Sequence, residues 1–299
     1  MLRGAAKAIA RQIPPIGRLI RLIRQPPRDR RDVILRNLDL DGLGLEIGPS
    51  HNPLLPKSQG YRVETIDHAD ANHLREKYRA LGQDVGRIEE VDYVSGGGSI
   101  FETIGKPGRY DYIVASHVIE HIPDILGFLQ DCERLLKPNG HVSLAVPDKR
   151  YCFDVFQALS TTGQVLQAHI DHASRPDPGT IFDHFANCAN RGGQITWPVE
   201  SKEKPCFIHD LTTAAELYEK GRSGTEYLDA HIWRFVPSSF RLIINDLNTL
   251  KEISLRELSF MVPGGFEFFV TLSRGGPGCR HDRLTLARQA LSEHAAVAS

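Results

Sequence analysis

Two acidic residues near the ends of two apolar stretches are the residues in this sequence best placed to do chemistry. Glu46 lies in the stretch Gly44–Ile47, which runs into a loop at Gly48. Asp67 ends the next stretch, 19 positions after Gly48, close to the spacing that places a carboxylate on ribose hydroxyls. A strand, a glycine-containing loop and a second strand with a terminal acid predict a nucleotide or nucleoside site.

The loop after Gly48 bears on which nucleotide is bound. A dinucleotide site favours G-x-G-x-x-G, because the backbone must approach a pyrophosphate closely. Here Gly48 is followed by Pro49, Ser50, His51 and Asn52, with no second glycine. Pro53 is suited to the first turn of a short helix. A nucleoside without phosphates does not need the missing glycines, so both kinds of ligand remain open at this point.

Apolar stretches alternate with helical patterns from residue 32 to residue 148. The expected strands are Gly44–Ile47, Arg62–Ile66, Ile88–Val91, Tyr110–Ala115 and His141–Val146. The expected helices cover Asn72–Leu81, Ser99–Ile104 and Pro123–Leu136. Alternation of this kind predicts an α/β, doubly wound, mostly parallel sheet with right-handed crossovers.

The alternation stops at residue 149. Residues 149–230 are aromatic and irregular, and we expect an insertion or lid on the substrate side. A helix over Ser238–Leu247 and strands over Ser254–Phe260 and Phe266–Leu272 complete the core within 231–274. The last two strands, joined by a short turn, predict an antiparallel pair at the edge of the sheet. Residues 275–299 form a tail with a small helix of no evident role.

Composition excludes several classes of protein. A net charge of −1 gives no overall bias toward nucleic acid. The five cysteines form no C-x-x-C pair, so a zinc knuckle and a disulfide framework are not indicated, and a cytoplasmic location is expected. No apolar run is long enough for a membrane-spanning helix.

Residues 1–31 differ from the rest, because they carry nine Lys or Arg and one acid. Apolar residues at helical spacing between the arginines make this segment amphipathic. Three interpretations remain open: a helix packed on the domain, a peripheral helix on anionic membrane, or a transit peptide.

Four segments together resemble class I S-adenosylmethionine-dependent methyltransferases, of the type-11-like kind. Leu45-Glu46-Ile47-Gly48 resembles the first motif, and Ile66-Asp67 the acidic end of the second strand. Residues 110–124 end in E-H-I-P-D and closely resemble the fourth-strand motif. Leu135–His141 resembles the L-K-P-G-G turn before the fifth strand. The resemblance implies a Rossmann-like sheet of seven strands with an antiparallel final strand, an insertion after the fifth strand, and S-adenosylmethionine as cofactor.

The resemblance also implies roles at the cofactor. Asp67 would accept hydrogen bonds from the ribose, and Glu46 would interact with the methionine ammonium group. Asp92 and Tyr93 would flank the adenine. The other residues expected beside the cofactor belong to the loops after the strands, namely Gly48, Pro49, Ser50, His68 and Ser116. The family's second and third motif glycines are Ser50 and Asn52 here.

Histidines supply the remaining candidates. His117 and His121 follow the fourth strand and are the candidate catalytic groups, each with a structural role as the alternative. The candidates on the acceptor side are Asp148, Lys149, Tyr151, His184 and His231. The metal-dependent members of the family need clustered acids, and because none is evident we expect no metal.

The acceptor is the least defined part of the interpretation. Aromatic and arginine side chains in 149–230 suit a sugar, and the overall pattern resembles methyltransferases found beside bacterial polysaccharide glycosyltransferases. The sequence therefore predicts O-methylation of a small molecule or glycan, without a nucleic-acid partner. The alternatives are a non-catalytic S-adenosylmethionine-binding module of glycan biosynthesis and, less favoured by the loop, an NAD-dependent dehydrogenase. The oligomeric state is not predicted.

Overall fold

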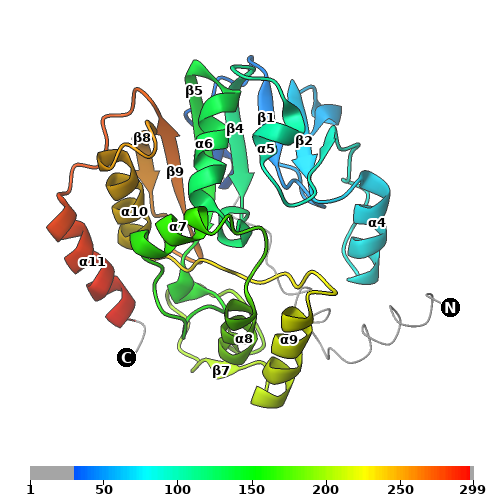
Figure 1. The fold of residues 1–299 in the computed structure, drawn as a ribbon, viewed down its shortest axis with the longest axis vertical. Coiled ribbons are helices and arrows are strands. Elements are labelled where there is room, and N and C mark those ends of the chain that lie inside the picture. Colours follow the sequence, from blue (N-terminus) through cyan, green and yellow to red (C-terminus); the bar gives the residue numbers. More distant parts are fainter. Residues whose placement is uncertain (1–29, 297–299) are drawn as a thin grey trace.

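The computed structural model of the chain describes residues 30–296 and centres on a seven-stranded sheet (Figure 1). The strand order is β3-β2-β1-β4-β5-β9-β8, and β9 alone runs antiparallel to its neighbours. The bounds are β1 Gly44–Ile47, β2 Val63–Asp67, β3 Tyr93–Val94, β4 Tyr110–Ser116, β5 Leu136–Pro147, β8 Arg256–Met261 and β9 Glu267–Ser273. This order confirms the predicted doubly wound, mostly parallel sheet with an antiparallel final strand.

Helices cover both faces of the sheet. Successive side chains of a strand point to opposite faces, so each face has apolar side chains that a helix can bury. On β4, Ile113 and Ala115 pack with α5, α6 and α10, whereas Tyr112 and Val114 pack with α3 on the opposite face. Figure 1 shows α6 and α5 across the sheet and α4 on the side of β2, toward the β3 edge. The bounds are α3 Arg30–Leu35, α4 Ala71–Ala80, α5 Ile100–Ile104, α6 Ile125–Leu135 and α10 Pro237–Thr249.

The third strand differs from the prediction. Residues 88–91 read as a strand in the sequence, but Ile88 is buried against Ala71 and Leu74 of α4. The strand is the short β3, which pairs with the last two residues of β2. One apolar residue that packs under a helix was therefore mistaken for part of the sheet. Similarly, β5 begins at Leu136 and not at His141.

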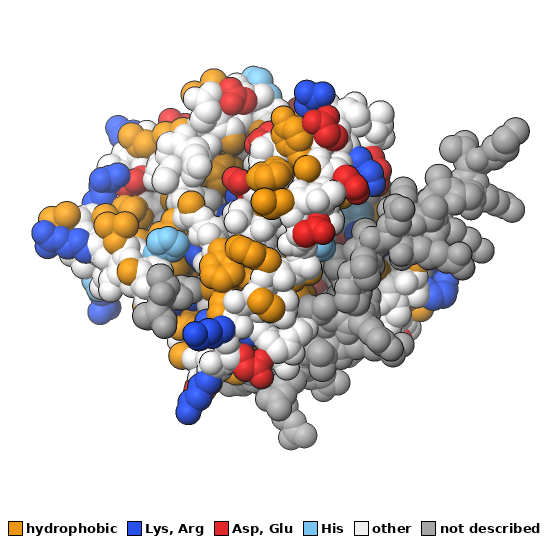
Figure 2. Space-filling view, turned by 90° about the horizontal axis from the view of Figure 1, so that it is seen from below, with side chains coloured by type: hydrophobic (Ala, Val, Ile, Leu, Met, Phe, Trp, Pro, Cys, Tyr) orange, Lys and Arg blue, Asp and Glu red, His pale blue; other side chains and the backbone are white. Residues whose placement is uncertain are grey.

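The insertion follows β5 and lies beyond the carboxyl ends of the parallel strands, below the sheet in Figure 1. Within it, α7 packs on α6, and α8 packs against α9. Its elements are η4 Lys149–Tyr151, α7 Thr162–Ile170, α8 Pro178–Asn187, β6 Ala189–Asn190, β7 Cys206–Phe207 and α9 Leu211–Ser223. Figure 2 views this side from below and shows hydrophobic side chains gathered among charged ones.

The C-terminal part of the chain is described up to residue 296, and the basic N-terminal segment only from residue 30. The expected tail forms α11, Arg283–Ala295, which packs on α10. Of the basic segment 1–31, only Arg30 and Arg31 are described, and both belong to α3. The predicted amphipathic helix before them lies outside the described residues. Among the helices that are described, none is long and apolar enough to cross a bilayer.

Candidate functional site

The loop after β1 turns sharply at Gly48, which has a φ of +65°. Its N–H donates to the carbonyl of Ile66, and a Cβ at this position would lie 2.9 Å from Val118 Cγ2. Only glycine adopts this conformation at low cost, so the backbone passes close to the segment after β4. Ser50, two residues later, also has a positive φ, of 50°. Gly48, Pro49 and Ser50 therefore lie where the prediction placed them, at the carboxyl edge of the sheet.

Glu46 is a buried carboxyl group in the middle of β1. Its two oxygens accept the backbone N–H groups of Leu54 (2.7 Å) and Leu55 (3.0 Å). Burial raises its pKa from 4.5 to about 7, although these hydrogen bonds oppose the shift. The short helix expected at Pro53 does not form over residues 53–56. The backbone N–H groups of Leu54 and Leu55, which the start of a helix would leave without partners, donate to Glu46 instead.

Asp67 ends β2 with its carboxylate at the carboxyl edge. One oxygen accepts Ser50 N–H (2.8 Å), and the other accepts His68 N–H (2.8 Å) and contacts His68 Nδ1 (2.6 Å). The His68 ring is half exposed, with Nε2 3.1 Å from Lys77 Nζ. A carboxylate offers about four lone-pair sites. The carboxylate thus has acceptor capacity beyond the two backbone N–H groups.

Asp92 and Tyr93 point elsewhere. The Asp92 carboxylate accepts the Thr65 N–H (2.7 Å) and pairs with Lys57. The Tyr93 hydroxyl donates to Glu64 (3.0 Å). Both partners precede the end of β2, so these side chains stabilise the sheet edge in this structure. Asp92 directly precedes β3 and Tyr93 is its first residue, and their contact with adenine stays a prediction.

Ser116 ends β4, His117 follows it, and both lie near the start of β9. Glu267 lies opposite Pro147, and its antiparallel direction places this first residue of β9 at the carboxyl edge. Glu267 pairs with Arg30 (2.6 Å) and with His117 Nε2 (2.9 Å), and Arg30 also donates to Ser116 Oγ (2.6 Å). Burial opposes a charge on His117, but the carboxylates of Glu120 and Glu267 raise its pKa to about 9.

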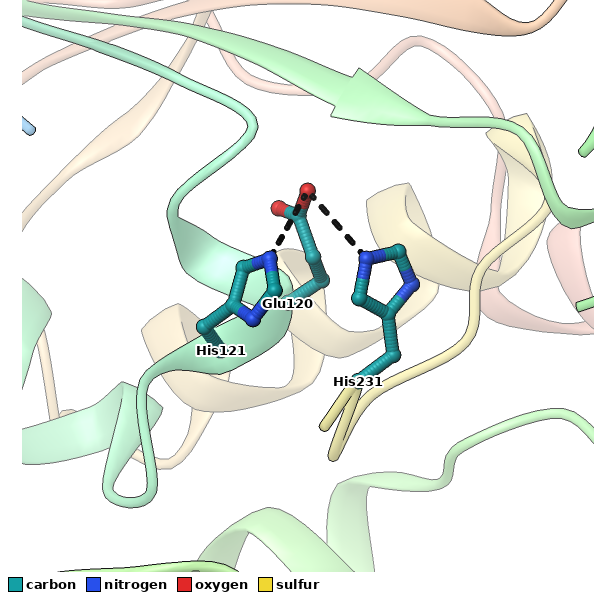
Figure 3. A group of neighbouring side chains, drawn as sticks. All are labelled: Glu120, His121 and His231. Carbon is teal, nitrogen blue, oxygen red and sulfur yellow. Dashed lines mark ion pairs between the residues drawn. The ribbon is translucent and has the colours of Figure 1, made fainter. Parts of the chain in front are cut away.

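Behind this edge lies a group that we call the Glu120 cluster, consisting of Glu120, His117, His121 and His231. Figure 3 shows His121, from the η3 turn Ile119–His121, and His231, from the loop after the insertion, facing one Glu120 oxygen. The Nε2 atoms lie 4.0 Å and 3.9 Å from it, and His117 Nδ1 lies at 3.6 Å. The loop is fixed because Ile232 N–H donates to the Glu120 carbonyl (2.8 Å).

Three of the cluster's neighbours orient the histidines. His231 Nδ1 contacts Asp154 (2.5 Å), and His121 Nδ1 contacts Asp229 (2.8 Å). The predicted candidate His184 accepts the backbone N–H of His231 (3.2 Å), and burial lowers its pKa to about 3. It is therefore neutral and acts on His231 as a hydrogen-bond acceptor.

Three predicted acceptor-side residues do not join the cluster. Asp148 is fully buried and pairs with Arg150 (2.6 Å). Lys149 is buried and donates to the carbonyl of Val155 (2.8 Å), and burial lowers its pKa to about 8. Tyr151 packs beside the small apolar cluster of the insertion. These contacts lie within the chain itself, and a place on the acceptor side stays a prediction for all three residues.

Several residues of the site were not predicted from the sequence. Glu120 and Glu267 are the central carboxylates. Asp154 and Asp229, which belong to the insertion, contact His231 and His121. Of these, Glu120 alone had a signal, because it lies in the E-H-I-P-D segment that was assigned no role beyond its histidine. The structure also brings Glu120, His121 and His231 into one group of possible metal ligands, whose atoms lie within 4.8 Å of one another.

Comparison with known proteins settles the family. The model of a methyltransferase domain family matches residues 20–241. The chain belongs to this methyltransferase family. The match confirms the class I resemblance, the enzymatic character and S-adenosylmethionine as the cofactor of this methyltransferase, and it leaves the dehydrogenase alternative without support.

The curated relatives match only a segment of the methyltransferase. A ubiquinone biosynthesis O-methyltransferase of Vibrio cholerae is 33% identical over 87 residues, which are 27% of this chain and 36% of the relative. One from Rhodopseudomonas palustris is 32% identical over 84 residues, 28% of this chain and 26% of the relative. The chain thus spans about a third of the length of these relatives.

Solved structures resemble the methyltransferase more distantly. An S-adenosylmethionine-dependent methyltransferase from Aquifex aeolicus is 14% identical, with a TM-score of 0.43 and coverage of 86% of this chain and 97% of that one. A protein from Rhodobacter sphaeroides described as a putative zinc-dependent alcohol dehydrogenase is 16% identical, with a TM-score of 0.47 and coverage of 84% and 91%.

Proposed function

We propose that this methyltransferase transfers the methyl group of S-adenosylmethionine to a hydroxyl oxygen of a small molecule or carbohydrate. One observation carries the proposal: His121 Nδ1 is held by Asp229, while its Nε2 faces the cluster at the end of β4. A neutral hydroxyl is a poor nucleophile, and a histidine oriented by a carboxylate is suited to remove its proton. His117, with a pKa of about 9, is protonated near neutral pH and supplies positive charge instead.

The residues at the carboxyl edge fit the cofactor. A side chain at Gly48 would fill the space beside Val118, and Asp67 offers a carboxylate at the end of β2. When bound, S-adenosylmethionine supplies an electrophilic methyl carbon on a sulfonium. Gly48 would carry the backbone past the methionine part, Asp67 would accept from the ribose, and Glu46 would face the ammonium group. Asp92 and Tyr93 remain proposed neighbours of the adenine that would have to exchange their present partners.

The chemistry balances with one proton released. The acceptor oxygen attacks the methyl carbon in line, the O–CH₃ bond forms, and the S–CH₃ electron pair returns to sulfur. The products are the methyl ether and S-adenosylhomocysteine. The hydroxyl proton passes to His121 Nε2 and then to water. Holding the two reacting groups in this geometry can supply about 7–11 kcal/mol of the barrier.

The acceptor would lie between the carboxyl edge and residues 149–230. Phe156 and Phe207 of the insertion are exposed, with ring centroids 5.1 Å apart, and exposed aromatic faces suit sugar rings. The curated relatives are O-methyltransferases, which supports oxygen as the attacked atom. A carbohydrate acceptor, a place in polysaccharide biosynthesis, a cytoplasmic location and contact of residues 1–31 with anionic membrane complete the proposal.

The test is methyl transfer from radiolabelled S-adenosylmethionine to matched panels of glycans and phenols. Calorimetry first establishes binding of S-adenosylhomocysteine, with NAD as the negative control. We expect His121→Gln to lower kcat by about 10²- to 10⁴-fold, the range for a general base, with S-adenosylhomocysteine affinity unchanged.

The matched control is His169→Gln. His169 also pairs with a carboxylate, Asp124 at 2.8 Å, but does not belong to the Glu120 cluster. Its variant should keep wild-type activity. Failure of the wild type to bind S-adenosylhomocysteine, or methylation confined to nitrogen acceptors, would refute the proposal.

A further inference from the structure

The Glu120 carboxylate is the feature that the proposed function leaves unexplained. The side chain is 1% exposed, and neither oxygen has a hydrogen-bond partner among the described residues. Burying an ionised carboxylate without compensation costs several kcal/mol, so such groups are paired or bind a cation. The groups that surround Glu120 must therefore account for it.

Those groups are ring nitrogens at distances that suit a shared ion. His117 Nδ1, His231 Nε2 and His121 Nε2 lie 3.6, 3.9 and 4.0 Å from Glu120 Oε1, too far for hydrogen bonds. Ligands bound to one ion at about 2.0–2.2 Å are separated from one another by about 3–4 Å. Figure 3 shows His121 and His231 converging on the same oxygen from two different segments.

Each of these rings is held from behind by a second carboxylate. Asp154 contacts His231 Nδ1, Asp229 contacts His121 Nδ1, and Glu267 contacts His117 Nε2. A histidine that binds a metal almost always donates its other N–H to such a partner, which fixes the tautomer and directs the free nitrogen to the ion. Two of these supported rings, His121 and His231, share one point with Glu120, because the ligand atoms of these three residues lie within 4.8 Å of one another.

The charges agree with a divalent cation. With His121 and His231 neutral, Glu120 and the two supports Asp154 and Asp229 contribute three carboxylates. Arg234 interacts electrostatically with Asp154, and Lys77 with Asp229. One negative charge remains for the ion. A site with mainly imidazole nitrogens and one carboxylate favours Zn²⁺ or its neighbours Co²⁺ and Ni²⁺ over Mg²⁺ and Ca²⁺, which prefer oxygen.

We propose that Glu120, His121 and His231 form a binding site for a divalent transition-metal ion of the zinc type, which leaves the fourth position of the ion open. The ion's further role rests on the proposed function: it would bind the acceptor hydroxyl and lower its pKa, so that metal binding replaces proton removal by His121. The acceptor is then a molecule whose oxygen can ligate a metal. The proton leaves to water, and the methyl transfer is otherwise unchanged.

The site is tested by loading the full chain, prepared without a polyhistidine tag and stripped with a chelator. Titration with Co²⁺ is followed by the visible absorption of the ion, and the bound zinc is measured by mass spectrometry. We expect one ion per chain. Glu120→Gln, which keeps the shape of the side chain, should abolish the Co²⁺ spectrum, and Asp154→Asn should weaken binding by about 10- to 100-fold.

His169→Gln is again the matched control and should bind Co²⁺ as the wild type does. Binding of S-adenosylhomocysteine by each variant verifies that it is folded. The metal proposal is overturned if the stripped wild type binds no Co²⁺ or Zn²⁺, if only Mg²⁺ binds, or if folded Glu120→Gln binds Co²⁺ like the wild type. Stoichiometric Co²⁺ binding without O-methylation of any acceptor would support the metal site and refute the proposed function.

Discussion

Replacing Glu46 by glutamine should make the protein's stability less sensitive to pH in the range where Glu46 ionises. The carboxyl group is buried, and burial raises its pKa to about 7 in the folded chain, against 4.5 when unfolded. The folded state therefore holds this proton more tightly than the unfolded state. The favourable free energy of folding from this group is greatest at low pH and is lost as the pH rises from 4.5 through 7.

The size of the effect follows from the two pKa values. At 1.36 kcal/mol per pKa unit, ionisation of Glu46 costs the wild type about 1 kcal/mol at pH 5 and about 3 kcal/mol at pH 8. Glu46→Gln has no such cost. It loses one of the two carboxylate hydrogen bonds to Leu54 and Leu55, but that loss is the same at both pH values. Relative to the wild type, the variant should gain about 2 kcal/mol between pH 5 and pH 8.

The assay is urea unfolding of both proteins without cofactor at pH 5 and pH 8. The chain offers a matched control in Glu89, which also accepts two consecutive backbone N–H groups, from Lys57 (2.6 Å) and Ser58 (2.9 Å). Glu89 is only partly buried. Burial opposes its charge, but the hydrogen bonds hold its pKa below the usual value. The stability of Glu89→Gln relative to the wild type should therefore change by close to zero between pH 5 and pH 8. An equal change in both variants would contradict the assignment of the effect to Glu46.

Three further predictions concern the cofactor loop and the amino-terminal segment. Asp67→Asn should weaken S-adenosylhomocysteine binding by about 10- to 100-fold in calorimetry, because hydrogen bonds to a charged group contribute about 1.5–3 kcal/mol; unchanged affinity would exclude the ribose contact. Gly48→Ala should destabilise more than Gly60→Ala in thermal unfolding, because both have positive φ, at a cost of about 1–2 kcal/mol, but only Gly48 also meets a neighbouring side chain. Deleting residues 1–29, which leaves Arg30 in place, should reduce cosedimentation with anionic vesicles, and equal sedimentation would remove the membrane interpretation.

The fold was largely predictable because its signals are local. Alternating apolar stretches gave β1, β2, β4 and the closing pair β8 and β9 within a few residues. The error at β3 came from Ile88, whose burial under α4 has the same sequence signal as burial in a sheet.

The site was predictable only in part, because it depends on contacts between distant segments. His117 and His121 follow β4, and their position at the carboxyl edge follows from the topology of the sheet. Asp154 and Asp229 contact the cluster only because the insertion returns to β4, and nothing in their neighbouring residues indicates this. Lys149 shows the converse: it lies just after the end of β5, yet its ammonium group donates to the Val155 carbonyl and does not join the Glu120 cluster.

The position of Glu267 at the start of the antiparallel β9 has a consequence for synthesis of the chain. The ribosome makes its partners, Arg30 and His117, early, and His121 soon after them. Arg30 and His117 acquire their common carboxylate, Glu267, only near the end of translation. While β9 is still within the ribosome, Arg30 lacks its carboxylate partner and His117 has only one of its two, Glu120. Assembly of the site therefore coincides with closure of the sheet, and nascent chains that end before β9 should remain inactive even where their nucleoside-binding half has already folded.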